Sequence, residues 1–500
     1  MRILFIYPNI NTQVGFNYGL SYISSYLRAE GIETFLLNIN EKLGYPLDLE
    51  RIKNDILSIK PDVIGFSVLT NQYKYALEIG NSIKTYMDVP IVFGGIHTTM
   101  DPQETLSEPC VDYICVGEGE EAILELIQKG SPQGVRNIGH KAKGCSVLEP
   151  LRPFTDITKL PFKDYELFDF QKLIDAKDGW VGLAASRGCP FRCTYCLNHK
   201  IMELYKDQGH LPKYYLRRHT VEQMIAEIKY LLSRYNNIKT FIFDDDIFTF
   251  DKKWLREFTE RYKETTDISF VCNAHARIFD EETAQYLKNA GCRIIKFGLE
   301  SGSDRVRRNV LHRFMSNRHI EEAFGVAHRF EFHTSAFVMI GLPNETIDDI
   351  KATVELLARI QPGRFRWSLF FPFVGTKAYE LAERAGEIDF DKMKKLDNFT
   401  DETCMVLGEE TDLYVDKVKT MLCTFVNGYG NLDGEEKYLE LIKKVEDLDT
   451  RSWHREKDRF LKEADALDRE MEEKGKLHYT VKFNPFMGVR SDWTDDSISA

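Results

Sequence analysis

The sequence predicts an α/β protein in which a doubly wound parallel sheet is followed by a partial (β/α)6 barrel and a helical region. Three observations support this prediction. Apolar strands alternate with amphipathic helices over the first 130 residues, and the alternation resumes after residue 175 with at least six β–α repeats. From about residue 381 the pattern becomes helical and strongly charged. We therefore expect a Rossmann-like domain at 1–135, a linker at 136–175, a barrel at 176–380 and a mainly helical C-terminal region at 381–500.

The first unit is predicted from a regular rhythm of strands and helices. Strands are expected at 2–8, 33–39, 62–70, 90–97 and 112–118, and helices at 17–30, 48–60, 72–87, 102–108 and from "GEEAILELIQKG" onward. In such sheets ligands bind beyond the C-terminal strand ends, where glycines let a large ligand approach the backbone. No G-x-G-x-x-G turn follows the first strand, which disfavours a dinucleotide.

The second unit follows a less regular stretch that proline and glycine punctuate and that we interpret as an inter-domain connection. Its strands are expected at 180–186, 240–246, 268–274, 293–300, 334–341 and 365–373, and its helices at 220–234, 252–264, 281–290, 317–330 and 346–361. The charged helices after this unit are predicted to form a cap or a partner surface.

Composition and charge limit the possible partners and the location. The net charge is −12, from 66 basic and 78 acidic residues, which disfavours nucleic acid because a phosphate backbone needs a basic face. The basic group "RVRRNVLHR" (305–313) is interpreted as a solvated helix face. The start, "MRILFIYPNINTQ", is predicted to be a strand, and no apolar run approaches the length of a transmembrane helix. We expect a cytoplasmic protein, and in that reducing compartment thiol clusters more often bind metal than form disulfides.

Three cysteines lie close together in "SRGCPFRCTYCLNHK": Cys189, Cys193 and Cys196. An odd number does not suit disulfides, and a tetrahedral zinc site usually takes four ligands in two separated halves. Three thiolates on one loop suit an iron–sulfur cluster with one iron left open. The loop follows the first strand of the predicted barrel, at the mouth where barrel chemistry concentrates.

The segment "CPFRCTYC" resembles the C-x3-C-x2-C signature of the radical S-adenosylmethionine superfamily, including the aromatic Tyr195 before the last cysteine. The resemblance implies a [4Fe–4S] cluster whose open iron chelates S-adenosylmethionine. An electron, delivered by an external donor of the flavodoxin or ferredoxin type, would then cleave the sulfonium and give a 5′-deoxyadenosyl radical. The cofactor carries this hard chemistry and the protein positions it.

Four further motifs extend the resemblance: "FIFDDDIFTFD", "CNAHARIFD", "GLESGSD" and "MIGLPNET". The family's contacts imply that the residues binding S-adenosylmethionine are Tyr195, Arg277, Gly298, Glu300, Ser301 and Gly302. Further cleft candidates are Asp244, Asp245 and Asp246. The three aspartates also suit a helix cap, and Arg277 also suits a structural ion pair.

The N-terminal sheet resembles the cobalamin-binding domain of the cobalamin-dependent branch of this superfamily, with "GGIHTT" and "GEGEE" as ligand loops. The fingerprint D-x-H-x-x-G, whose histidine ligates cobalt, is missing, so cobalamin is expected without that lower ligand. His97 is an alternative candidate, although a lone loop histidine is more often a hydrogen-bonding residue. The expected cobalamin-binding residues are Asn9, Ser67, Thr70, Gly94, Gly95, His97, Thr98, Gly117 and Glu118.

These resemblances imply a cobalamin-dependent radical methyltransferase that acts on an unactivated carbon, or less often phosphorus, of a small-molecule, lipid or natural-product substrate. Cyclisation, rearrangement or oxidation without methyl transfer stays open as the alternative. A methylthiotransferase is disfavoured, because that class has three N-terminal cysteines and a basic tail, whereas this chain offers only Cys110 and Cys115 and an acidic tail. A non-catalytic cofactor-binding sensor would not need the contacts around Glu300.

Overall fold

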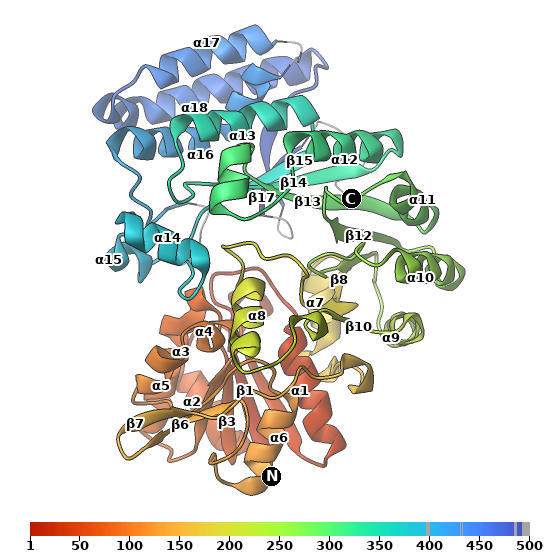
Figure 1. Cartoon of the computed structure of the whole chain (residues 1–500), viewed down its shortest axis with the longest axis vertical. Helices are drawn as coiled ribbons and strands as arrows, with labels where there is room; N and C mark the ends of the chain where they lie inside the picture. Colours follow the sequence, from red (N-terminus) through yellow and green to blue (C-terminus); the bar gives the residue numbers. More distant parts are fainter. Residues whose placement is uncertain (397–400, 431, 433, 485–487, 493–500) are drawn as a thin grey trace. The chain divides into compact units, whose positions relative to one another are not determined.

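The computed structural model describes residues 1–396, 401–430, 432, 434–484 and 488–492 (Figure 1). The chain divides into two compact units. The first comprises residues 1–191, 196–241 and 373–376, and the second comprises 192–195, 242–372 and 377–500.

The first unit is built on a seven-stranded sheet of order β2-β1-β3-β4-β5-β6-β7. Its strands are β1 (Arg2–Pro8), β2 (Glu33–Ile39), β3 (Val63–Ser67), β4 (Ile91–Gly94), β5 (Tyr113–Cys115), β6 (Ile138–Ala142) and β7 (Cys145–Leu148). Its helices are α1 (Tyr18–Ala29), α2 (Leu49–Ile59), α3 (Tyr73–Lys84), α4 (Ile96–Met100), α5 (Pro102–Ser107) and α6 (Glu120–Lys129). Strands β1 to β5 are parallel, and β1 lies between β2 and β3, so the strand order reverses there. This doubly wound sheet confirms the predicted fold class and places a ligand site at the C-terminal strand ends.

The core of this unit lies where helices cover the sheet. Ile64 and Phe93 from the strands pack with Ile56 of α2 and Ile83 of α3, and none of the four side chains is exposed. Full burial of each such side chain stabilises the fold by about 1.5–3 kcal/mol. The apolar residues whose spacing predicted these helices therefore lie on the buried faces of the helices.

Two local expectations for this unit were wrong. The strand expected to reach residue 97 ends at Gly94, because Gly95 adopts φ +94° and the chain turns directly into α4. A Cβ at Gly95 would lie 2.6 Å from the amide nitrogen of Val68, so only glycine allows this approach. The first part of the expected linker, 136–175, instead contains β6 and β7, which pair antiparallel with β5 and with each other.

The polypeptide after β7 forms several elements, of which β8 belongs to the second sheet. They are α7 (Phe170–Ala176), β8 (Trp180–Leu183), β9 (Ser186–Arg187), α8 (Leu197–Asp207), β10 (Arg217–Arg218) and α9 (Val221–Arg234). Helix α8, which begins directly after the last cysteine of the predicted cluster loop, was not predicted.

The second sheet has the order β16-β17-β15-β14-β13-β12-β11-β8, and the division between the units runs through β11. Its remaining strands are β11 (Thr240–Phe243), β12 (Ser269–Ala274), β13 (Cys292–Glu300), β14 (His333–Ile340), β15 (Arg364–Leu369), β16 (Thr480–Asn484) and β17 (Gly488–Asp492). The helices between them are α10 (Lys252–Thr265), α11 (Glu281–Asn289), α12 (Asn317–Arg329) and α13 (Ile347–Ile360). Strands β12 to β15 pair in parallel and in sequence order, so the predicted partial barrel is confirmed.

The C-terminal region is mainly helical, as predicted, with a strand pair at its end. Its helices are α14 (Lys377–Ala385), α15 (Phe390–Met393), α16 (Glu409–Tyr429), α17 (Glu435–Glu446) and α18 (Thr450–Glu473). Trp453 of α18 is fully buried and donates its indole N–H to Asp416 of α16 at 2.6 Å. Strand β17 pairs antiparallel with both β16 and β15, which extends the sheet. In the described part of the chain no helix is long and apolar enough to cross a membrane.

Candidate functional site

The cysteine loop connects β9 to α8. Gly188 precedes the first cysteine with φ +91°, and a Cβ there would lie 2.5 Å from the carbonyl oxygen of Tyr215, so this turn requires glycine. Cys196 is the N-cap of α8, a position where the helix dipole favours negative charge. The amide Nδ2 of Asn198 lies 3.5 Å from the Cys196 sulfur, and the Tyr215 hydroxyl donates to the Asn198 Oδ1.

The middle of the loop belongs to the second unit. Thr194 is fully buried; its hydroxyl donates to the carbonyl of Val310 at 2.6 Å, and its amide donates to the carbonyl of Leu311 at 3.0 Å. These bonds fix the residue beside Cys193, which is buried. The guanidinium Nη1 of Arg313 approaches the Cys193 sulfur at 3.5 Å.

Glu300 lies at the C-terminal end of β13 in a strained conformation. Its φ is +69°, unusual for a residue with a side chain, and the pairing of β13 with β14 shifts register between Gly298 and Glu300. The Tyr195 hydroxyl donates to the Glu300 carboxylate at 3.0 Å. A Cβ at Gly298 would lie 2.4 Å from that carboxylate, so glycine makes room for it. Backbone strain of this kind concentrates at functional sites.

Arg313 completes this group, and sequence reasoning missed it. Its Nη2 donates to the Gly298 carbonyl at 2.6 Å. Burial lowers the pKa of Arg313, but the neighbouring Tyr195, Glu300 and Cys193 outweigh burial and raise it. Burial has the opposite effect on a carboxyl group and raises the pKa of Glu300. The Arg313 cation and the Tyr195 hydroxyl offset only part of this rise.

The expectation of a solvated helix face for residues 305–313 was wrong for two of its arginines. Arg307 is fully buried and donates to the carbonyls of Ser301 and Met315, and Arg313 is 9% exposed. Residues Val306–Val310 form a π-helical turn, a widened geometry that often marks functional sites. Arg307 lies within this turn and Arg313 lies three residues after it; the basic group itself was the available signal, but the burial of these side chains could not be inferred from the sequence.

Ser301 and Gly302 contact α13. Ser301 is fully buried with its hydroxyl 3.4 Å from that of Thr353, and the Gly302 amide donates to the Thr353 hydroxyl at 2.8 Å. A Cβ at Gly302 would lie 2.2 Å from the carbonyl oxygen of Ala352. In this structure both residues therefore hold the end of β13 against α13.

The other candidates of the second unit lie after β11 and β12. Arg277 is exposed and donates to the carbonyl of Phe314 at 3.3 Å. Asp244 is exposed and lies 4.0 Å from the ammonium of Lys296, whereas Asp245 is buried and Asp246 is exposed. The structure thus brings Tyr195 and Glu300 together.

Glu345 of the "MIGLPNET" turn is a buried carboxyl group. One oxygen accepts the amides of Gly341 and Leu342 at 2.7 and 3.0 Å, and the other has no hydrogen-bond partner among the described residues. Burial raises the pKa of Glu345 to about 8, and the two backbone amides offset only part of this rise. The folded protein therefore favours the protonated carboxyl.

We expect Glu345→Gln to stabilise the protein increasingly as the pH rises. Because the folded-state pKa of about 8 exceeds the ordinary value of 4.5, the contribution of Glu345 to wild-type stability is fully present below pH 4.5 and is lost as the pH rises through 8. The free energy of unfolding of the variant should exceed that of the wild type by on the order of 4 kcal/mol at the top of this window. Urea unfolding at several pH values measures the difference. The exposed Glu257→Gln variant should follow the wild type, and a parallel pH profile for Glu345→Gln would contradict the prediction.

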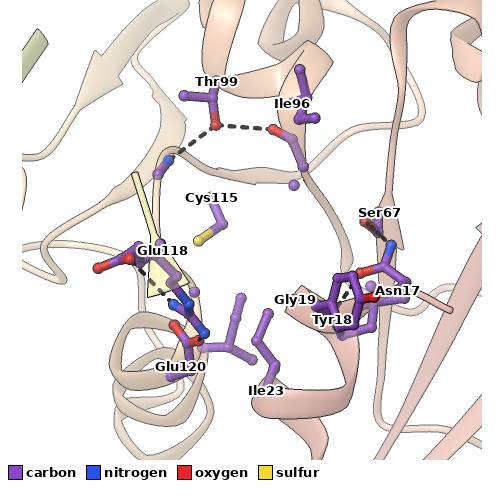
Figure 2. Close-up of a pocket in the computed structure, with 18 of the residues that line it drawn as sticks. Asn17, Tyr18, Gly19, Ile23, Ser67, Ile96, Thr99, Cys115, Glu118 and Glu120 are labelled. Carbon is purple, nitrogen blue, oxygen red and sulfur yellow. Dashed lines mark hydrogen bonds and ion pairs between the residues drawn. The ribbon is translucent and has the colours of Figure 1, made fainter. Parts of the chain in front are cut away.

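The first unit contains a cavity of about 500 Å³ at its parallel sheet (Figure 2). Its walls come from α1, from the ends of β3, β4 and β5 and from the polypeptide after β8. Side chains that line it include Ile23, Ser67, Ile96, Thr99 and Cys115, with glycines at 65, 94, 95, 117 and 119. Such a largely apolar, glycine-lined space accommodates a flat or bulky group close to the backbone.

Polar groups fix the rim of this cavity. The Asn17 amide donates to the Ser67 hydroxyl at 3.0 Å, and the Thr99 hydroxyl accepts the Gly117 amide at 3.1 Å. Arg187 pairs with Glu118 at 3.2 Å and with Glu120 at 2.6 Å. Burial raises the pKa of Glu118, but Arg217 and Arg187 outweigh it and hold this pKa below its ordinary value.

Five of the nine expected cobalamin-binding residues line the cavity: Ser67, Gly94, Gly95, Gly117 and Glu118. The remaining four, which are Asn9, Thr70, His97 and Thr98, do not line it. His97 is buried in α4 against the Tyr73 ring, at 3.9 Å between ring centroids, and burial lowers its pKa to about 4.

The donor groups of the second unit and the cysteine loop suit an iron–sulfur cluster. None of the ten cysteines, all of which lie in the described residues, forms a disulfide. In the described ranges no three His, Cys, Asp or Glu side chains, those of the loop cysteines included, are gathered to hold a metal ion. A [4Fe–4S] cluster uses thiolate ligands, and three of them on one loop fit that group.

Comparison with known proteins decides the family. The family model described as "B12 binding domain" matches residues 12–127, and the family model described as "Radical SAM superfamily" matches residues 183–357. The chain belongs to the radical S-adenosylmethionine enzymes that carry a B12-binding domain. This radical S-adenosylmethionine enzyme accordingly uses a [4Fe–4S] cluster, S-adenosylmethionine and cobalamin.

Relatives of the enzyme span most of its length. It is 29% identical over 397 residues to "Uncharacterized methyltransferase PH0819" of Pyrococcus horikoshii, covering 76% of this chain and 83% of that protein. It is 24% identical to the anaerobic magnesium-protoporphyrin IX monomethyl ester cyclase of Rubrivivax gelatinosus, covering 82% and 76%. The structure of the radical S-adenosylmethionine methyltransferase TsrM from Kitasatospora setae superposes with a TM-score of 0.62 at 18% identity, covering 77% and 76%. This last similarity supports the two-unit fold.

Proposed function

We propose that the enzyme transfers a methyl group to an unactivated carbon, or to phosphorus, of a small-molecule, lipid or natural-product substrate. The observation that carries the proposal is that one chain holds both the Glu300–Tyr195–Arg313 group beside Cys193 and a glycine-lined cavity in a B12-binding domain. The methyltransferase relative from P. horikoshii aligns with 76% of the chain and supports it.

The chain's own residues divide the work as follows. Cys189, Cys193 and Cys196 would hold the cluster, which supplies the electron that cleaves S-adenosylmethionine. Glu300, oriented by the Tyr195 hydroxyl, would accept a hydrogen bond from the bound S-adenosylmethionine. Arg313 would hold the negative charge of the Cys193 thiolate and of Glu300 in one place. Arg277, Gly298, Ser301 and Gly302 and the aspartates 244–246 stay candidates for the same cofactor site.

The cavity of the first unit would take part of cobalamin, with Ser67, Gly94, Gly95, Gly117 and Glu118 at its wall. Its glycines leave space where any side chain would intrude. Asn9, Thr70, His97 and Thr98 stay predictions from the sequence and do not line this space.

Ile96→Trp is expected to lower cobalamin retention by about tenfold, because Ile96 lines the cavity and the larger indole would fill part of it. Ile96 is 38% exposed, so the substitution should leave the fold intact. Cobalamin per chain is measured by absorbance after anaerobic reconstitution with hydroxocobalamin. The control is Leu57→Trp, since Leu57 is 41% exposed on α2 and does not line the cavity. Equal retention by both variants would remove this cavity from the cobalamin site.

A second candidate function is cyclisation or oxidation without methyl transfer, and the 24% identity to a cyclase favours it. The products of S-adenosylmethionine separate the two. A methyltransferase that uses one S-adenosylmethionine for the radical and one for the methyl group forms S-adenosylhomocysteine and 5′-deoxyadenosine. A cyclase forms 5′-deoxyadenosine alone.

The test is an anaerobic incubation of cobalamin-loaded enzyme with S-adenosylmethionine and dithionite, with both products quantified by liquid chromatography. Formation of both products supports methyl transfer, and 5′-deoxyadenosine alone supports the cyclase. Absence of both refutes either function. We propose a flavodoxin or ferredoxin as the physiological electron donor and the cytoplasm as the location, where ten cysteines without a disulfide are expected.

A further inference from the structure

The inner face of the second sheet carries an arginine without an acidic partner. In the strand register Gly298 of β13 pairs with Phe337 of β14, and Phe337 pairs with Arg366 of β15. Directly paired residues of parallel strands point to the same face of a sheet, and successive residues point to opposite faces. Phe297 packs against Phe324 of α12, at 5.0 Å between ring centroids, so Arg366 lies on the face turned away from that helix.

That face is also the face of the Glu300 group. A Cβ at Gly298 would contact the Glu300 carboxylate and the Arg313 guanidinium, which places both groups over Gly298. Two strand spacings of about 4.8 Å separate β13 from β15, so the backbone of Arg366 lies roughly 10 Å from that of Gly298. A small molecule lying over Phe337 is long enough to reach both.

Arg366 itself is half-buried and uncompensated. Among the described residues no hydrogen bond, ion pair or cation–π contact to its guanidinium is formed, and burial lowers its pKa. Two other arginines of this unit have acidic partners: Arg359 pairs with Glu321 at 2.8 Å, and Arg305 pairs with Asp349. A partly desolvated cation without an anion is costly to a fold, and its retention points to a partner that arrives from outside.

The side chains around Arg366 leave room for such a partner. Phe337 and Met339 of β14 and Ser368 of β15 share its face and are each half-buried, so the face is neither closed nor fully solvated. Two apolar side chains and one hydroxyl group beside a cation can contact the apolar body and the polar groups of a small organic anion.

We propose that Arg366 binds an oxyanion of the substrate, a carboxylate or a phosphate, while the body of the substrate lies over Phe337 toward Glu300. The planar guanidinium matches both oxyanions with two parallel hydrogen bonds. The inference rests on the proposed function, because it names the class of substrate that the enzyme takes.

The test compares the thermal unfolding of anaerobically purified, cluster-loaded wild type with Arg366→Met and Arg366→Lys. Without added anion, Arg366→Met should unfold about 2–4 °C higher than the wild type, because it removes an unpaired buried charge. Inorganic phosphate or acetate, at an ionic strength matched with sodium chloride, should raise the wild-type midpoint and leave that of Arg366→Met unchanged. Arg366→Lys keeps the positive charge but lacks the two parallel N–H donors of the guanidinium. Its unfolding midpoint should therefore rise less than that of the wild type when the anion is added.

The two anions distinguish the two kinds of substrate oxyanion. A rise of the wild-type midpoint with phosphate alone indicates a phosphate group on the substrate, and a rise with acetate alone indicates a carboxylate. The control variant is Arg359→Met, which removes an exposed, paired arginine and should not raise the midpoint. A lower midpoint or failure to fold for Arg366→Met, with Arg366→Lys unaffected, would make Arg366 a structural cation and overturn the proposal. Equal responses of wild type and Arg366→Met to both anions would overturn it as well.

This outcome is separable from that of the proposed function. Thermal stability and its response to anions need no turnover. Wild-type enzyme that forms neither 5′-deoxyadenosine nor S-adenosylhomocysteine would refute the function and leave the anion result intact. Turnover without an anion response would refute only the role of Arg366.

Discussion

Cys193→Ala is expected to abolish 5′-deoxyadenosine formation, with a loss of about 10³-fold or more. The Cys193 thiolate would be one of three cluster ligands, and it is the one held beside the Arg313 guanidinium at 3.5 Å. Without the cluster no other group of the protein can supply the electron that cleaves S-adenosylmethionine. Iron content should fall from about four atoms per chain to well below that value, measured with 5′-deoxyadenosine in the same anaerobic preparation.

Cys404→Ala is the matched control for this prediction. Cys404 is 1% exposed, lies in the same unit and belongs to no cysteine group, so its loss tests the effect of removing a buried thiol alone. It should keep both iron and turnover. If Cys193→Ala kept its iron and its 5′-deoxyadenosine formation, the assignment of the cluster to this loop would be wrong.

Glu300→Gln is expected to lower 5′-deoxyadenosine formation by about 10²-fold while leaving iron content unchanged. The substitution keeps the size of the side chain but removes the charge that accepts the Tyr195 hydroxyl at 3.0 Å and faces Arg313. Charge-assisted hydrogen bonds are roughly twice as strong as neutral ones. The affinity for S-adenosylmethionine, measured by calorimetry, should fall by at least about tenfold.

Glu331→Gln controls for the unusual backbone. Glu331 also has a positive φ, of 56°, but it is exposed and follows α12, away from the β13 end. It should retain wild-type affinity and turnover. Loss of iron in Glu300→Gln would show instead that Glu300 supports the cluster loop, and unchanged affinity would exclude it from the S-adenosylmethionine site.

Strand and helix positions were predictable where one face of an element is buried. Strands β1 and β2 lie at the predicted residues, because their apolar runs are bounded by polar turns. Ile96 and His97 were predicted as the end of a strand and lie in α4 instead, since the turn depends on how closely Gly95 approaches Val68. That approach is a tertiary property, and the β-branched residues of "IHTT" favour a strand locally.

The candidate site divides in the same way. The cysteines and Glu300 could be proposed from the sequence because they lie in short motifs at strand ends. Arg313 and Arg366 were not proposed from the sequence, because what places each one is distant in sequence: Cys193 in one case, and the sheet face shared with Gly298 in the other. From the sequence alone a basic residue is expected to be exposed to solvent, and only the register of the sheet shows which residues surround it.

The pairing of β15 with β17 has a consequence for how the chain is synthesised. Arg364 pairs with Asp492, so the outer edge of β15 stays open until residue 492, which follows more than 120 residues later, has left the ribosome. An uncovered strand edge invites pairing with another nascent chain, and such long-range closure slows folding. The second unit should therefore depend on chaperones more than the first, whose parallel strands are complete by Cys115.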